Sequence, residues 1–211
     1  KYGNKLDEKV DYSYPILAWA PRGNYLAIAY EEKGKNVIKF YDAVEEEWRQ
    51  KRYLMQLDKV LSMQYNSKGN QLVISSIIKG QSDIFIYYIG SNSFKRLTND
   101  IYDDHYPSFM NNDEGIIFSS NRRKDTLRLD IATNKHFKQD TIQGIDQRDL
   151  FYYNLKSSSL VLRRVTNTPL ADEIHAYGIG QNQFTWISDE SGITNRYAGR
   201  FDSTISYVDT T

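Results

Sequence analysis

The chain has 211 residues, of which 40% are hydrophobic, and its 27 basic side chains balance 27 acidic ones. That hydrophobic share is enough for a sizeable core, whereas a net charge of zero gives no support to a general affinity for nucleic acid or other polyanions. Cysteine is absent, which excludes disulfides, thiol catalysis and cysteine zinc sites, and no run of 18 apolar residues predicts insertion into a membrane.

The first fourteen residues resemble the end of a preceding structural unit. The chain starts at Lys1 without Met and without a signal peptide. These features predict a mature product or a fragment of a longer protein.

The next pattern in chain order is an aromatic residue that ends a strand, a polar turn with glycine, and a second apolar strand. It starts at Trp19 and recurs at Tyr65 and Phe109, with a weaker fourth copy at Tyr177. Recurrence of a strand pair indicates a repeat architecture. Aromatic residues at a fixed position of a repeat commonly fill the contact between neighbouring repeats. We therefore predict that these four residues lie in the core between neighbouring units.

A second pattern runs out of step with the first. An Asp-led, aromatic-rich strand is followed by a turn and a strand that ends in basic–apolar–Thr-Asn, from Asp83 to Asn99 and again from Asp149 to Asn167. Runs rich in Ile, Val, Tyr, Phe and Thr that are bounded by Gly, Asn and Ser are typical of β-strands. We expect the two Asp residues to close their loops through backbone amides rather than to contact a ligand. Residues 44–52 have helix-forming side chains but fall where a turn and an outer strand belong.

Combined, the two patterns give four strands per unit of roughly 40–45 residues, which is the spacing of β-propeller blades. The expected fold is all-β: one domain that is a β-propeller-type array of four-stranded antiparallel blades. Three complete units and one incomplete unit are few for a closed propeller, so we predict a partial propeller or a fragment of a larger one. The expected units are residues 15–58, 60–104, 105–171 and 173–211, with an insertion at 122–148.

These motifs resemble the WD-like repeats of TolB-like propellers. Trp19-Ala-Pro-Arg-Gly-Asn resembles the Trp-Ser-Pro-Asp-Gly-Lys signature of that family, and Arg96-Leu-Thr-Asn resembles its Arg-Leu-Thr ending. The stretch from Ser188 to Tyr197 resembles its Ser-Asp-Arg-x-Gly-x-x-x-Ile-Tyr phrase, so the resemblance covers most of the chain from about Pro15. It implies a non-enzymatic scaffold of the bacterial envelope, periplasmic or at the cell surface, that needs no cofactor. The implied partner is another envelope or outer-membrane-associated protein.

Similar repeats also occur in peptidase propellers, so the alternative is the non-catalytic propeller of a larger prolyl-oligopeptidase-type peptidase. A sugar-binding propeller is a third interpretation, which draws only on the aromatic content. No Gly-x-Ser-x-Gly motif occurs in this chain, and the nearest match, from Gly80 to Asp83 around Ser82, falls in a predicted loop. We therefore expect no catalytic residue within these 211 residues.

Two of the three histidines, His105 and His175, each follow a pair of acidic residues just before an inner strand. A His/carboxylate metal site is one interpretation, and capping of the strand by polar side chains is the other, which we favour. The acidic group from Asp100 to Asp104 lacks the ligand spacing and the glycine of a dedicated calcium loop. No metal site is therefore predicted.

The insertion joins the second strand of its unit to the third. In propellers this loop and the loop before each inner strand emerge on the same face, and extra length in one loop of a repeat usually maps to a binding face. We therefore predict that a protein partner binds there, with an insertion that has no role as the alternative. The expected contact residues are Asp103, Asp104, His105, Arg122, Arg123, Lys124 and His175.

Overall fold

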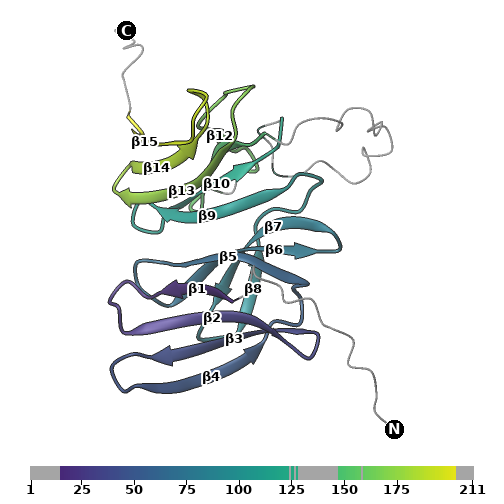
Figure 1. Ribbon diagram of the computed structural model, residues 1–211, viewed down its shortest axis with the longest axis vertical. Coiled ribbons are helices and arrows are strands. Elements are labelled where there is room, and N and C mark those ends of the chain that lie inside the picture. Colours follow the sequence, from purple (N-terminus) through teal and green to yellow (C-terminus); the bar gives the residue numbers. More distant parts are fainter. Residues whose placement is uncertain (1–14, 124, 126, 128–146, 158, 203–211) are drawn as a thin grey trace, which may run out of the picture.

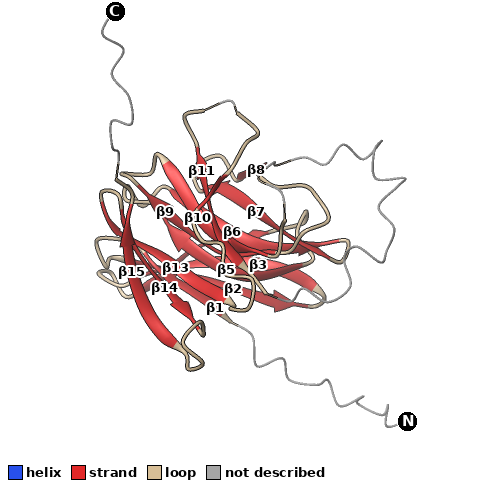
Figure 2. Cartoon of the chain, turned by 90° about the horizontal axis from the view of Figure 1, so that it is seen from above, coloured by secondary structure: helices blue, strands red, loops and turns tan. Residues whose placement is uncertain are grey.

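The computed structural model describes residues 15–123, 125, 127, 147–157 and 159–202, which form fifteen β-strands and no helix (Figures 1 and 2). Sheet 1 contains β1 (Ile16–Trp19), β2 (Tyr25–Glu32), β3 (Lys35–Asp42) and β4 (Glu47–Tyr53). Sheet 2 contains β5 (Lys59–Tyr65), β6 (Gln71–Ile78), β7 (Gln81–Tyr88) and β8 (Ser93–Arg96). Sheet 3 contains β9 (Asp104–Met110), β10 (Gly115–Ser120), β11 (Asp149–Asn154) and β12 (Arg163–Arg164). Sheet 4 contains β13 (Glu173–Gly180), β14 (Gln183–Ser188) and β15 (Asn195–Arg200).

Every sheet is antiparallel, and within each sheet the strands that are adjacent in the chain pair with each other. The predicted all-β array of four-stranded antiparallel units is thus confirmed in sheets 1 to 3, and residues 47–53 form an outer strand as expected. Sheet 4 has three strands among the described residues, and residues 203–211 lie outside them, as do 124, 126 and 128–146 of the expected insertion. Within the described part, no helix is long and apolar enough to cross a membrane.

One backbone hydrogen bond recurs in all four sheets and fixes which positions correspond. The residue after the third strand donates to the residue before the second strand, in the bonds Ala43 N to Asn24 O, Ile89 N to Asn70 O, Leu155 N to Glu114 O and Phe201 N to Asn182 O. The β1–β2 and β5–β6 turns use Gly23 and Gly69 at φ of 68° and 73°, a backbone region that favours glycine. The four units therefore share one local architecture.

Three apolar cores hold the sheets together, one between each pair of neighbours, and the sheets follow one another from sheet 1 in purple to sheet 4 in yellow-green (Figure 1). Alternate residues of a strand point to opposite faces, so one strand can serve two cores. In β6, for example, Leu72 and Ile74 pack toward sheet 1, whereas Val73 packs toward sheet 3. This alternation is why the central strands β6, β7 and β10 of sheets 2 and 3 are buried on both sides.

The predicted inter-sheet aromatic position is confirmed in the two middle sheets. Tyr65 is 6% exposed in the core between sheets 1 and 2, and Phe109 is 7% exposed in the core between sheets 2 and 3. The prediction is wrong for Trp19, which is 57% exposed. Its neighbour Ala18 packs toward sheet 2, so alternation turns Trp19 to the opposite face of sheet 1, where no described sheet lies.

The prediction is also wrong for Tyr177, which is 52% exposed. Gly178 pairs with Phe184 in the same way as Phe109 pairs with Ile116, so the glycine and not the tyrosine holds the inter-sheet position. A second β-bulge between Gly178 and Gly180, which β9 lacks, shifts the register at this end of β13, so Tyr177 pairs with Thr185 and not with Phe184.

Gly178 provides a test of this register. A Cβ atom at Gly178 would lie 2.4 Å from the backbone oxygen of Phe109, which cannot rotate away. We expect Gly178→Ala to lower the free energy of unfolding by about 1–3 kcal/mol, measured by urea denaturation. Gly180→Ala is the control, because its nearest contact would be an ordinary 3.6 Å, and equal stability of the two variants would contradict the register.

Candidate functional site

The loops that precede the inner strands meet the loops between the second and third strands at one end of the sheets. We call this the loop face and define its described part as residues 33–34, 54–58, 79–80, 97–103, 121–123, 147–148, 165–172 and 189–194. Backbone amides there donate to side chains within the same sheet: Lys79 N to Asp58 Oδ2 at 2.6 Å, Asp103 N to Asn121 Oδ1 at 2.9 Å, and Asp172 N to Asp189 Oδ1 at 2.8 Å. These bonds fix the two kinds of loop against each other.

Asp103 and Asp172 also bind across the boundaries between sheets. The carboxylate of Asp103 accepts the hydroxyl of Ser82 at 3.0 Å and its amide at 3.3 Å, which links sheet 3 to sheet 2. Asp172 accepts the amide of Arg148 at 3.0 Å and pairs with its guanidinium, which links sheet 4 to sheet 3. Ser82 and Arg148 each stand directly before the Asp of the second sequence pattern, so this is one repeated inter-sheet link.

The link brings Ser82, Asp103 and His105 together, and these are the three residue types of a serine-hydrolase triad. Ser82 Oγ lies 3.3 Å from His105 Nε2. However, the hydroxyl donates to Asp103, and Ser82 is only 3% exposed. A catalytic serine needs the histidine as its base and the carboxylate behind the histidine. The arrangement therefore matches a structural link better than an activated nucleophile.

Arg122 lies in the interior of the loop face and not at its rim. Its side chain is fully buried and its Nη2 donates to both carboxylate oxygens of Asp104 at 2.7 Å, while Nη1 donates to Asp100 at 3.2 Å. The ring of Phe118 lies under the guanidinium, 5.6 Å from it. Burial raises the pKa of Asp100, and the charge of Arg122 opposes that rise.

The sequence-based role of Arg122 and Asp104 as partner contacts therefore needs correction. Both are almost fully buried, at 2% and 0% exposure, so a partner at the surface cannot reach their charges. They anchor the first residues of the insertion to the beginning of β9, and Asp100 adds an anchor in the loop before that strand. Sequence alone does not reveal this, because a surface arginine and a buried one look alike.

The Asp residues of the second pattern clamp the third strand to the end of the fourth. Asp149 accepts the amide of Thr168 at 3.0 Å, as expected, and pairs with Arg164 at 2.6 Å. Asp83 instead contacts two side chains, Arg96 and Thr98, so the expected bond to a backbone amide is not what this residue makes. Burial raises the pKa of Asp83 to about 6, against the opposing effect of Arg96.

The Thr of the basic–apolar–Thr-Asn ending makes the same hydrogen bond in sheets 2 and 3. Thr98 Oγ1 accepts the amide of Ile84 at 2.9 Å, and Thr166 Oγ1 accepts the amide of Leu150 at 2.8 Å. The recurring phrase is thus explained by the structure of each sheet, and it requires no ligand.

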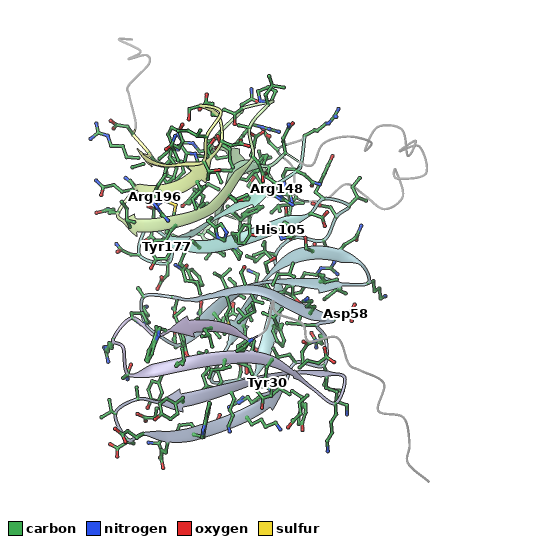
Figure 3. All side chains as sticks on the ribbon, viewed as in Figure 1. Tyr30, Asp58, His105, Arg148, Tyr177 and Arg196 are labelled. Carbon is green, nitrogen blue, oxygen red and sulfur yellow. The ribbon has the colours of Figure 1, made fainter. Side chains whose placement is uncertain are left out.

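His105 is half-buried beside the Ser82 link, and Figure 3 shows it below Arg148. Burial lowers the pKa of His105, and the nearby charge of Arg148 lowers it further. The folded protein therefore favours the neutral ring. Below an unfolded-state pKa of about 6.5, the unfolded chain binds more protons than the folded one, so stability falls as the pH falls.

We expect the free energy of unfolding to decrease less between pH 7 and about pH 5 in His105→Gln than in the wild type. Asp83, with its raised pKa, changes stability in the opposite direction, but it is present in both proteins and cancels in the difference. Urea denaturation of both proteins across this range measures the effect. Parallel pH profiles would show that protonation of His105 is not coupled to folding.

The insertion begins beside an open cavity of about 620 Å³. Its lining includes Arg123, Asp125, Gln147, Arg164 and Asn167. Arg164 pairs with Asp125 at 3.1 Å, whereas Arg123 is exposed and has no ion pair within the described part of the chain. Lys124, the other predicted cation, lies outside the described residues.

The acidic residues near the two histidines are engaged in other contacts. Asp100 and Asp104 are paired with Arg122, and Asp103 with Ser82. His175 lies apart from this group and contacts Tyr106 instead. The described residues contain no group of three or more His, Asp or Glu side chains placed to hold a metal ion.

One further signal for the inter-sheet links is readable in the sequence. An Asp stands one residue before the inner strand in three units, at Asp58, Asp103 and Asp172. The carboxylates of Asp103 and Asp172 bind across a sheet boundary, whereas that of Asp58 accepts the amide of Lys79 within sheet 2. The partners across the boundary cannot be read in the same way, because Ser82 and Arg148 share a position but no chemistry.

No protein-family profile and no curated protein matches the sequence, but solved structures do. TolB from Acinetobacter baumannii matches with a TM-score of 0.63 and 14% identity, over 90% of this chain and 41% of that one. The putative TolB from Agrobacterium tumefaciens matches with a TM-score of 0.60 and 12% identity, over 88% of this chain and 57% of that one. A prolyl endopeptidase matches with a TM-score of 0.57 and 9% identity, over 87% of this chain and 26% of that one.

The chain therefore spans less than two thirds of the length of each of these structures. Identities this low establish a shared fold and leave the activity open. The succession of four antiparallel sheets, the cores between them and these matches together identify the chain as a partial β-propeller with the fold of TolB-like proteins.

Proposed function

We propose that this chain is a non-catalytic scaffold that binds a protein partner through the loop face next to the insertion. The observation that supports this most directly is Arg123, an exposed cation without an ion pair among the described residues, at the edge of the 620 Å³ cavity. The sheets use their side chains for packing and their backbone groups for pairing. Only the loops are free to vary, and a guanidinium at a rim suits carboxylates of a partner.

The test compares two loop-face variants with a control. One variant replaces residues 124–146 by a short Gly-Ser bridge, the second is Arg123→Glu, and the control is Lys95→Glu on the outer strand β8 of sheet 2. Each tagged protein is cross-linked in an envelope extract, and captured proteins are quantified by mass spectrometry. We expect one partner to be lost with both loop-face variants and kept with the control. Capture of the same partner at unchanged affinity by the deletion variant would contradict the proposed site.

We further propose a location in the bacterial envelope, either periplasmic or at the cell surface. The support is the likeness to two TolB structures together with the repeat motifs. Cell fractionation of the tagged full-length protein tests the location independently of partner binding. Recovery in the cytoplasmic fraction alone would contradict it.

The second candidate is the propeller of a larger peptidase. The specific observation in its favour is the match to a prolyl endopeptidase and to the tricorn protease, the latter with a TM-score of 0.56. The sequence of the full-length gene distinguishes the two candidates. A hydrolase domain with Gly-x-Ser-x-Gly favours the peptidase, and a gene without one favours the scaffold.

Both candidates predict that this chain alone has no hydrolase activity. Ser82 is buried and its hydroxyl donates to Asp103 rather than to a base. We expect no turnover of peptide or ester substrates above the uncatalysed rate, and no difference between the wild type and Ser82→Ala. Turnover that disappears in Ser82→Ala would show that the trio with His105 is catalytic after all.

A further inference from the structure

A second open cavity, of about 420 Å³, lies beside the inner strands of sheets 2, 3 and 4. Its polar lining consists mainly of Ser62 and Gln64 from β5, Tyr106 and Ser108 from β9, His175 from β13 and Arg196 from β15. Apolar side chains, Met63 and Ile187 among them, complete the wall. No residue that lines this cavity carries a carboxylate, unlike the cavity beside the insertion.

Two residues of the wall have an unusual backbone conformation. Tyr106 and His175 adopt φ of 51° and 52°, a left-handed region that residues other than glycine rarely occupy. They hold equivalent positions, because each lies in a β-bulge of the inner strand, opposite Phe118 and Trp186 respectively. Bulges redirect side chains, and backbone strain of this kind concentrates at functional sites.

The bulges place the two rings against each other across the boundary between sheets 3 and 4. The centroids of Tyr106 and His175 are 3.8 Å apart and the ring planes are inclined by 34°. At this distance and inclination the two rings stack on each other, so the pair meets the cavity with its ring edges and outer faces. A planar aromatic group can pack edge-to-face or offset-stacked against them.

The charge in this cavity is carried by Arg196. Partial burial lowers the pKa of His175, and the Arg196 guanidinium lowers it further, so the histidine is neutral at pH 7. Arg196 is exposed and donates to Thr185 Oγ1 at 3.3 Å, and no ion pair to it exists within the described residues. Figure 3 shows Arg196 and Tyr177, which also lines the cavity, on the same side of sheet 4. An unpaired guanidinium in a cavity without acids favours an anion, above all a carboxylate.

We propose that this cavity binds an aromatic carboxylate, with its ring against the Tyr106–His175 pair and its carboxylate on Arg196. Two sources share this chemistry: a free aromatic acid, and the C-terminal aromatic residue of a polypeptide. The site goes beyond the proposed scaffold function, because Arg196 and Tyr106 are not among the predicted partner contacts. Its presence or absence therefore leaves the loop-face proposal unaffected.

The first test compares ligands by calorimetry on the intact chain. The probes are 3-phenylpropionate, N-acetyl-Ala-Phe with a free carboxylate, and the C-terminal amide of that dipeptide. We expect at least one of the two acids to bind saturably. If the dipeptide acid binds, we expect the dipeptide amide to bind at least about tenfold more weakly than that acid. Tighter binding of 3-phenylpropionate assigns the site to free acids, and tighter binding of the dipeptide acid assigns it to polypeptide C-termini. Absence of saturable binding by both acids, or equal binding of dipeptide acid and amide, overturns the proposal.

The second test compares variants with the tighter acid. Arg196→Gln removes the charge, and Tyr106→Gly removes the ring while glycine tolerates the left-handed backbone. Arg200→Gln is the matched control, because it lies on the same strand and the same face but outside the cavity. We expect about tenfold or greater weakening with Arg196→Gln, weaker binding with Tyr106→Gly and no change with the control. Wild-type affinity in Arg196→Gln, with an unchanged melting temperature, overturns the assignment.

Discussion

Replacement of Arg122 by Met is expected to lower the free energy of unfolding by about 3–5 kcal/mol, measured by urea denaturation. The guanidinium is fully buried and forms ion pairs with both Asp100 and Asp104. Without it, two carboxylates remain in the interior with no counter-charge. Removal of one partner from a buried ion pair costs far more than the net contribution of the pair itself.

A triple variant separates this effect from the loss of packing. Arg122→Met combined with Asp100→Asn and Asp104→Asn removes every charge of the cluster while it keeps the side chains similar in size. We expect the triple variant to be more stable than the single one, because no unpaired charge remains buried. A single variant that loses less than about 1 kcal/mol would show that water reaches the carboxylates and that the cluster is not truly interior.

Truncation of Phe109 to Ala is the second change with a large expected effect, a loss of about 3–5 kcal/mol in the free energy of unfolding. The ring is 7% exposed and packs between sheets 2 and 3 with Val73, Ile84 and Ile116, among others. Alanine removes most of this contact and leaves a cavity between two sheets that are held in place by other contacts. Chemical denaturation measures the loss.

Trp19→Ala is the matched control, because Trp19 and Phe109 hold the same place in the repeat. The indole is 57% exposed, so we expect the variant to lose about 1 kcal/mol or less. A loss as large as that of Phe109→Ala would mean that the isolated chain covers Trp19 in solution. The pair of variants therefore tests the assignment of inner and outer faces in sheet 1.

Some polar residues of the loop face hold the sheets and loops together, and others are exposed to solvent. Asp103 and Asp172 link neighbouring sheets, and the Arg122 cluster fixes the beginning of the insertion. Arg123 directly follows the buried arginine and is exposed. Because its backbone is anchored on one side, Arg123 itself loses little backbone freedom when a partner contacts it.

The candidate contacts could be predicted from the sequence only in part. The position of the loops followed from the repeat, but the exposure of each side chain did not. Arg122 and Arg123 are adjacent and chemically identical, yet one is buried with two carboxylates and the other faces solvent. Burial depends on where Asp100 and Asp104 lie in space, and these residues belong to the loop before β9 and to β9 itself.

The sequence by itself determined the architecture of this protein. Alternating apolar strands, polar turns and two recurring phrases specify four-stranded antiparallel sheets, because strand pairing between chain neighbours is a local property that residue type and turn chemistry control. The aromatic position was also determined in the two middle sheets, at Tyr65 and Phe109.

The tertiary structure alone decided what lies on each face and which side chains meet. The same repeat position is buried at Phe109 and exposed at Trp19, because burial requires a neighbouring sheet and not only the right residue. Bulges with left-handed residues bring Tyr106 onto His175 from strands of different sheets. Such contacts depend on register shifts of a single residue and on the packing of whole sheets, and no local pattern in the sequence encodes either.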